Sequence, residues 1–72
     1  MRKGEAETME NNLVGERLKK LRGERTQKEV ADAVGVLASS YSMYETGVRV
    51  PRDEVKRRIA EYYGVSVATI FF

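Results

Sequence analysis

The sequence contains no cysteine and no histidine among its 72 residues. Disulfides, thiolate metal sites and imidazole chemistry are therefore excluded, so we expect no metal and no cofactor. No apolar run approaches the roughly 18 residues of a membrane span, and residues 1–12 lack the hydrophobic stretch of a signal peptide. A cytoplasmic protein without a membrane partner is the expectation.

The composition fits a single folded domain. Hydrophobic residues make up 42% of the chain and charged residues 33%, a balance that is typical of a globular domain and not of a disordered chain. The net charge is +2, and residues 1–12 contain more acidic than basic side chains, so the positive excess lies in the remainder. This excess is compatible with a polyanionic partner but does not by itself indicate one.

The first residues are polar and have no apolar period, so we expect a flexible arm over residues 1–11 and a folded domain over residues 12–72. Asn11 or Asn12 should cap the start of the first helix, which should end near Gly23 to Arg25. Its buried side is Val14, Leu18 and Leu21, and its solvated side is Glu16, Arg17, Lys19 and Lys20.

The next segment has the start and stop signals of a short helix. Thr26 and Glu29 form a capping-box pattern, in which the Thr hydroxyl and the Glu carboxylate each bind a free backbone N–H group. The helix should therefore begin near Gln27, and Gly35 should end it because glycine adopts a positive φ without steric cost. Its buried side is Val30, Ala31 and Val34.

A third helix is expected over residues 37–46, with Gly47 at its end. At 100° per residue, one face carries Leu37, Tyr41 and Tyr44 and should belong to the core. The opposite face is nearly uncharged and consists of Ala38, Ser39, Ser42, Met43 and Thr46.

Two further helices complete an all-α fold of five helices. The fourth runs from about Asp53 to Gly64 and should bury Val55, Ile59 and one of Tyr62 or Tyr63. Ser66 can cap the last helix, which holds Val67, Ile70 and Phe71. Because a core of this size takes only one of two terminal phenylalanines, Phe72 should be exposed.

The second and third helices form a unit that fits the major groove of DNA. Two short helices joined by a glycine turn can place small side chains of the second helix in a groove about 12 Å wide. The segments TQKEVADAVGV and SSYSMYETGVRVP resemble the helix-turn-helix of the lambda repressor and Cro family. The resemblance runs from Val14 to Phe71, and it implies a compact five-helix, lambda repressor-like DNA-binding domain.

The resemblance also implies roles for individual residues. Base edges would be read from Ala38, Ser39, Ser42 and Met43. Phosphate or sugar contacts would come from Gln27, Ser40 and Arg49, to which we add Lys28 and Arg52 because they lie next to the recognition helix. Arg22 would pair with Glu45 and fix the recognition helix against the body of the domain.

The sequence departs from the family at three places. The connection before Thr26 is two residues shorter than usual, which affects the angle between the first two helices. Leu37 replaces the Ser or Thr that usually caps the recognition helix. The base-facing positions hold no Arg, Asn or Gln for a bidentate base contact, so specificity is expected from half-site spacing and DNA shape.

These observations predict a sequence-specific regulator of transcription, with a repressor favoured, that binds double-stranded DNA as a homodimer. The candidate dimer contacts are Ile70, Phe71 and Phe72. The alternative is a protein-interaction module, such as an antitoxin or an adaptor, whose uncharged helix face contacts a protein. An enzyme is not expected because the serines lack an activating His or Cys, and no small-molecule effector is expected because 72 residues leave no room for a ligand domain.

Other residues have simpler interpretations. The four tyrosines lie at helical spacing and are interpreted as core residues with a hydroxyl at the surface. Most lysines and arginines are interpreted as a solvated helix face.

Overall fold

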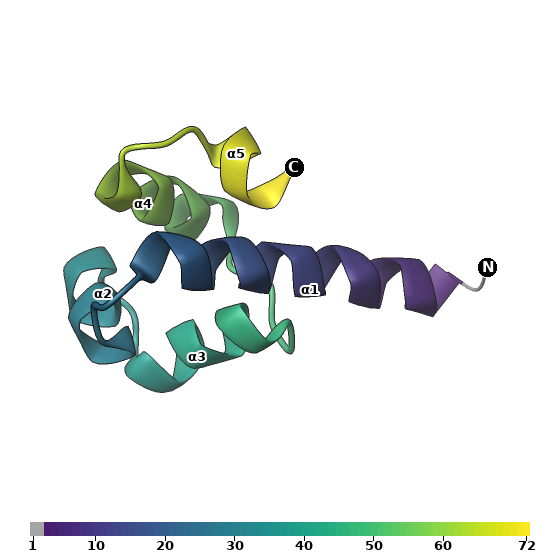
Figure 1. Cartoon of the computed structure of the whole chain (residues 1–72), viewed down its shortest axis with the longest axis horizontal. Coiled ribbons are helices and arrows are strands. Elements are labelled where there is room, and N and C mark those ends of the chain that lie inside the picture. The colour runs from purple at the N-terminus through teal and green to yellow at the C-terminus, as the bar shows by residue number, and fades with distance from the viewer. Residues whose placement is uncertain (1–2) are drawn as a thin grey trace.

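The computed structural model describes the backbone of residues 3–72 and the side chains of residues 13–72. Within this range the helices are α1 (Lys3–Arg22), α2 (Gln27–Val34), α3 (Ala38–Thr46), α4 (Asp53–Tyr63) and α5 (Val67–Phe71), with no strand. In Figure 1, α1 crosses the middle of the molecule, with α4 and α5 on one side of it and α3 on the other. The predicted all-α fold of five helices is confirmed.

The first helix is longer than expected. It begins at Lys3 and not at Asn11 or Asn12, so that prediction was wrong, and its N-terminal part extends beyond the other helices (Figure 1). The helix extends toward the N-terminus over residues 3–12 because these residues include alanine and glutamates, which favour helix, and no proline that would interrupt it. The division into an arm over residues 1–11, the first two of which lie outside the described residues, and a domain over residues 12–72 stays a prediction.

The helix ends follow local signals that the sequence contains. The Thr26 hydroxyl accepts a hydrogen bond from the Glu29 backbone N–H at 3.0 Å, which is the Thr half of the predicted capping box. Gly35 ends α2 with φ 78°, in the left-handed region that glycine adopts without strain. The Ser66 hydroxyl caps α5 by accepting from the Thr69 N–H at 3.2 Å. These signals are readable from sequence because each spans no more than about one helical turn.

The core lies where the helices meet. Its buried residues are Leu18, Val30, Ala31, Val34, Tyr41, Tyr44, Ile59, Ala60 and Ile70. The predicted buried faces of the first, second and fourth helices are confirmed, with Tyr63 as the more buried of the two adjacent tyrosines.

Leu37 does not belong to the core, and its predicted burial was wrong. Its side chain is 72% exposed. Leu37 has φ −70° and ψ 146° and precedes the first turn of α3, so the 100° periodicity of the helix does not place it on the buried face.

The backbones of α1 and α3 touch at a glycine. A Cβ atom placed on Gly15 would lie 2.1 Å from the carbonyl oxygen of Glu45 and 2.8 Å from its carbonyl carbon. Any side chain at position 15 would therefore force the two helices apart. The close approach fixes where α3 sits on the body of the domain.

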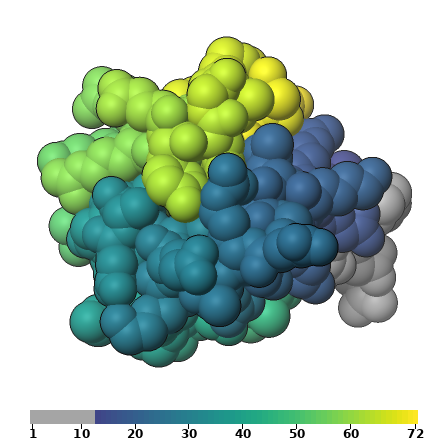
Figure 2. Space-filling view, turned by 60° about the vertical axis from the view of Figure 1, so that its left-hand side comes forward, coloured from purple at the N-terminus to yellow at the C-terminus, as the bar shows by residue number. Residues whose placement is uncertain are grey.

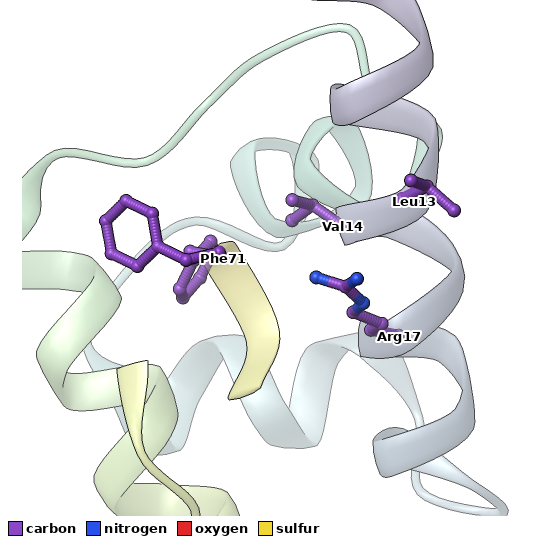
Figure 3. A pocket seen from close by; sticks show the side chains of 5 residues that line it. Leu13, Val14, Arg17 and Phe71 are labelled. Carbon is purple, nitrogen blue, oxygen red and sulfur yellow. The ribbon is translucent and has the colours of Figure 1, made fainter. Parts of the chain in front are cut away.

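The C-terminal helix packs on α1 through an unexpected hydrogen bond. Arg17 was expected on the solvated side of α1, but its Nη1 atom donates to the carbonyl oxygen of Ile70 at 3.1 Å. In Figure 3 the Arg17 guanidinium lies in the gap between α1 and the end of α5, beside Val14 and Phe71. The bond satisfies a carbonyl at the end of α5 that the short helix cannot satisfy itself.

The last three residues differ in their exposure. Ile70 is fully buried in the core, so its predicted role as a dimer contact was wrong. Phe71 is half-buried, and Phe72 is 84% exposed, as expected for a core that takes only one of the two rings. Only Phe72 and part of Phe71 remain available to a second copy of the chain.

On the face that Figure 2 shows, the helices pack directly against one another. In the space-filling view of Figure 2, α2 and the turn before it occupy the near face, with α4 and α5, in yellow-green and yellow, packed directly above them. Across residues 3–72, none of the helices has the length and apolar character that crossing a membrane requires.

Candidate nucleic-acid interface

Helices α2 and α3 are joined by the three residues Gly35, Val36 and Leu37. The left-handed Gly35 turns the chain, and the Val36 N–H closes the end of α2 by donating to the Ala31 carbonyl at 2.9 Å. Tyr41 and Tyr44 bury one side of α3 against the core. The other side of α3 is therefore presented outward by a fixed support.

The outward face of α3 carries small or unbranched uncharged side chains. Of the four residues expected to read bases, Ala38, Ser39 and Met43 are exposed and Ser42 is half-buried. The one charged residue of α3, Glu45, is buried. The face that would enter a groove thus brings no carboxylate toward the phosphates.

Three of the five expected phosphate contacts lie around one depression beside α3. Its volume is about 330 Å³, and Ser40, Arg49 and Arg52 are among its lining residues together with Leu37 and Val50. No acidic side chain lines it. Two exposed guanidinium groups therefore stand next to the start of α3, where they give the surface a positive local charge.

The other two expected phosphate contacts have partners within the protein. The Gln27 Nε2 atom donates to Glu45 Oε1 at 3.0 Å, so this amide group helps to hold α3. Lys28 is exposed and forms an ion pair with Asp32 at 2.9 Å, one helical turn away. Because this pair is open to solvent, it is weak and leaves the ammonium group able to exchange partners.

The carboxylate of Glu45 anchors the C-terminal end of α3 to α1 and α2. Arg22 Nε donates to Oε2 at 2.7 Å and Arg22 Nη2 donates to Oε1 at 3.1 Å, in the bidentate pairing that the resemblance implied. The Glu45 side chain is fully buried, while the Arg22 side chain is about a quarter exposed. Burial alone opposes ionisation, but the hydrogen bonds from Arg22 and Gln27 outweigh it and hold the pKa of Glu45 below its usual value.

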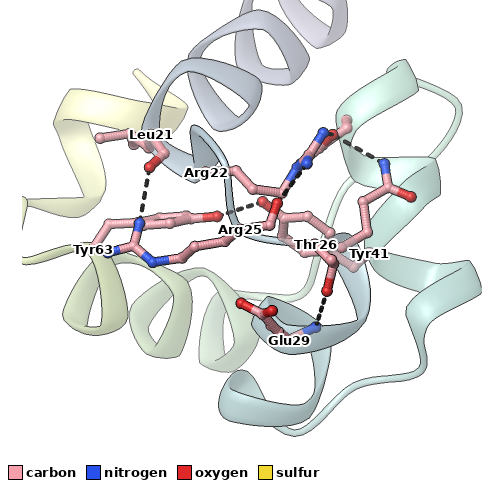
Figure 4. A network of polar contacts seen from close by, with 9 residues as sticks. Leu21, Arg22, Arg25, Thr26, Glu29, Tyr41 and Tyr63 are labelled. Atoms are coloured by element: carbon pink, nitrogen blue, oxygen red, sulfur yellow. Dashed lines mark hydrogen bonds and ion pairs between the residues drawn. The ribbon is translucent and has the colours of Figure 1, made fainter.

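The short connection between α1 and α2 does not prevent this pairing. Gly23 has φ 58° and turns the chain at the end of α1. Arg22 Nη1 donates to the Arg25 carbonyl at 2.7 Å, and Arg25 Nη1 donates back to the Leu21 carbonyl at 3.2 Å. Figure 4 shows Arg22 and Arg25 at this turn, with the Arg25 guanidinium group bonded to Leu21. The same Arg22 side chain therefore binds both the turn and the Glu45 carboxylate.

A second polar link joins α3 to α4. The hydroxyl groups of Tyr41 and Tyr63 are 2.7 Å apart (Figure 4). Tyr41 is fully buried, so its expected hydroxyl at the surface was wrong; the group is instead satisfied by its partner. Burial is the main reason that the pKa of both hydroxyls is raised, and each stays neutral at ordinary pH.

Several exposed apolar side chains near α3 were not expected from the sequence. Leu37 precedes the helix, and Val48 and Val50 follow it with 75% and 50% of their surface exposed. For Leu37 a signal was available, since it occupies the capping position where a polar side chain is usual. The valines lie in a loop without periodicity, so the sequence gives no such signal for them.

The comparisons with known proteins agree with this geometry. The family described as "Helix-turn-helix domain" matches residues 13–70. The chain is also 35% identical, over 60 residues, to the transcriptional repressor RstR of the cryptic phage CTXphi in Vibrio cholerae. The aligned part covers 81% of this chain and 54% of that repressor, so the chain spans about half the length of this relative. No solved structure matches the chain closely enough to be counted as similar.

Proposed function

The chain belongs to the helix-turn-helix domain family, and from this premise we propose that it is a transcriptional repressor that binds duplex DNA by placing α3 in the major groove. The observation that carries the proposal is the outward face of α3, which is uncharged and consists mostly of small side chains, with Arg49 and Arg52 lining a depression beside it. A relative that covers most of this chain is itself named a transcriptional repressor.

In this proposal phosphate contacts orient the domain and α3 reads the sequence. Ser40, Arg49 and Arg52 would bind the phosphates that flank the groove, while Gln27 and Lys28 would reach the backbone from the start of α2. Ala38, Ser39, Ser42 and Met43 would face base edges. Because none of these four forms a bidentate hydrogen-bond pair with a base, DNA shape and half-site spacing would contribute much of the specificity.

The buried contacts below α3 support the same function. Helix α3 is held at three points: by Gly15 against its backbone, by Arg22 at Glu45, and by Tyr63 at Tyr41. A recognition helix fixed in this way loses little conformational freedom when it binds, so more of the interaction energy appears as affinity.

We further propose that two copies bind a two-fold operator, with half-sites about 10 bp apart or a multiple of it. Phe72 and the half-buried Phe71 line a depression together with Leu13, Val14 and Arg17. The exposed ring of Phe72 offers apolar surface to a second copy. Figure 3 shows Leu13, Val14, Arg17 and Phe71 around this depression. Light scattering at increasing concentration tests this contact. A Phe72→Ser variant should shift the distribution toward monomers, whereas a Val48→Ser variant should leave it unchanged.

A duplex-binding titration over a range of salt concentrations tests the main proposal. DNA selected from a random pool would supply the duplex, and its consensus would show whether the site is two-fold. Affinity should fall steeply with salt as phosphate contacts release counterions. Arg49→Ala and Arg52→Ala should each reduce the slope of log affinity against log salt by about one unit.

A matched control keeps the test specific. Lys19→Ala removes an exposed cation from α1, on the predicted solvated face, and should leave the slope unchanged. Failure to retain any duplex at low salt would refute the proposal. Recovery of a stoichiometric protein partner that is lost on Met43→Glu, with DNA retention unaffected, would favour the protein-interaction module instead.

A further inference from the structure

The start of α3 carries an apolar side chain that the fold does not explain. Leu37 occupies the capping position of α3 and forms no side-chain hydrogen bond to it. Its side chain is 72% exposed. A leucine here leaves the first N–H groups of the helix without a side-chain acceptor and holds apolar surface in water, so neither the cap nor the core accounts for it.

The residues around Leu37 indicate the chemical character of a partner that it could contact. Leu37 and Val50 line the depression that also holds Arg49 and Arg52, and no acidic side chain lines it. Ala38 and Met43, on the adjoining turns of α3, are uncharged and exposed. A small apolar spot flanked by guanidinium groups matches a target in which an apolar group lies between negative charges.

The major groove of DNA offers such a target at one base. Thymine presents a C5-methyl group there, and none of the other three unmodified bases carries a methyl group. The phosphates of both strands line the edges of the groove, where cationic side chains beside α3 can bind them. The first residues of a recognition helix are those that lie closest to the base edges.

We propose, on the premise that the chain binds duplex DNA as set out above, that Leu37 is a specificity-determining residue that contacts the C5-methyl group of thymine, with Ala38 beside it. The operator would then contain a thymine opposite the start of α3 in each half-site. Specificity at that position would come from burial of a methyl group, which compensates for the absence of a side chain that hydrogen-bonds to bases.

Replacement of thymine by uracil in the selected duplex tests this proposal, because uracil lacks the methyl group and keeps the same charge and base pairing. At a fixed salt concentration, the duplex with uracil at the contacted position should bind about fourfold more weakly for each methyl group lost. The Leu37→Ala variant should lose most of the preference for the thymine duplex. Val48→Ala, which shortens another exposed apolar side chain beyond the far end of α3, should keep the full preference for thymine.

A second variant distinguishes a loss of thymine preference from a loss of helix stability. Leu37→Ser supplies a hydroxyl that can cap α3, so the helix should be at least as stable as in the unmodified chain, yet the preference for thymine should be lost. Equal binding of both duplexes by the unmodified chain would overturn the proposal, and so would a full thymine preference in Leu37→Ala. Both results leave DNA binding intact, whereas failure to bind any duplex would refute the function itself.

Discussion

Replacement of Gly15 by alanine should destabilise the domain, although alanine is the better helix former. In an exposed helix interior this change stabilises by about 0.5–1 kcal/mol. At position 15 the added Cβ would lie 2.1 Å from the Glu45 carbonyl oxygen. Even close C–H to oxygen contacts lie at about 3.3–3.6 Å, so α1 and α3 must separate by about 1 Å.

The packing cost should exceed the gain in helix propensity. Overpacking in well-packed cores costs about 1–3 kcal/mol, and the upper end applies here because the atoms that collide are backbone atoms of a second helix. The net loss is therefore about 2 kcal/mol. For a domain of this size, that lowers the melting temperature by about 8–16 °C.

Thermal unfolding followed by circular dichroism measures this effect. Gly23→Ala is the matched control: Gly23 has φ +58° with nothing within 4 Å of an added Cβ, so that variant tests backbone strain without a collision and should lose about 1 kcal/mol. The Gly15 variant should also bind duplex DNA more weakly than its folded fraction explains, because α3 is displaced. An unchanged or raised melting temperature for Gly15→Ala would refute the reasoning.

Three further predictions concern polar groups that hold α2 and α3. Arg22→Met should cost about 3 kcal/mol near pH 7 by stranding the buried Glu45 carboxylate. Since the pKa of Glu45 is lowered in the folded chain, its stabilising effect is present above its ordinary pKa and lost in acid. Urea unfolding at pH 7 and pH 4 should therefore show a smaller penalty at pH 4, and equal penalties would contradict the assignment. Because the pKa values of Tyr41 and Tyr63 are raised, their contribution is complete below pH of about 10 and is lost above it. The melting temperature should fall from pH 8 to pH 11, and less so with phenylalanine at both positions; an equal fall would count against the pair. Thr26→Ala should remove the cap of α2 at a cost of about 1 kcal/mol, which a melting curve detects, and an unchanged curve would mean that the cap adds no stability.

The helix boundaries show which helix ends can be predicted from local sequence signals. Thr26 and Ser66 cap helices through hydroxyl groups that reach an N–H three residues later, and Gly35 ends α2 where a positive φ is needed. Each interaction closes within about one turn, so it is the same whatever the rest of the chain does. The N-terminal start of α1 was missed because that stretch has no apolar period from which a helix could be predicted.

The contacts of the expected site residues were also predicted only in part. The resemblance to the family correctly predicted that Arg22 pairs with Glu45, 23 positions later in the sequence. It could do so because a family pattern contains information on tertiary contacts, which helical periodicity does not. Gln27 donates to the same carboxylate, a contact that the sequence did not predict, and its phosphate contact stays a prediction. Ile70, expected at a dimer contact, lies in the core because α5 folds back on α1.

Sequence by itself determined the number and order of the helices, the caps of α2 and α5, the buried faces of α1, α2 and α4, and the uncharged outward face of α3. These depend on backbone geometry that repeats every few residues. Only the tertiary structure decided that Gly15 lets α1 touch α3, that Arg17 caps α5, and that Leu37 lies exposed at a depression that two arginines also line. Those features depend on which surfaces of different helices meet, and a helix pattern does not contain the position of its neighbour.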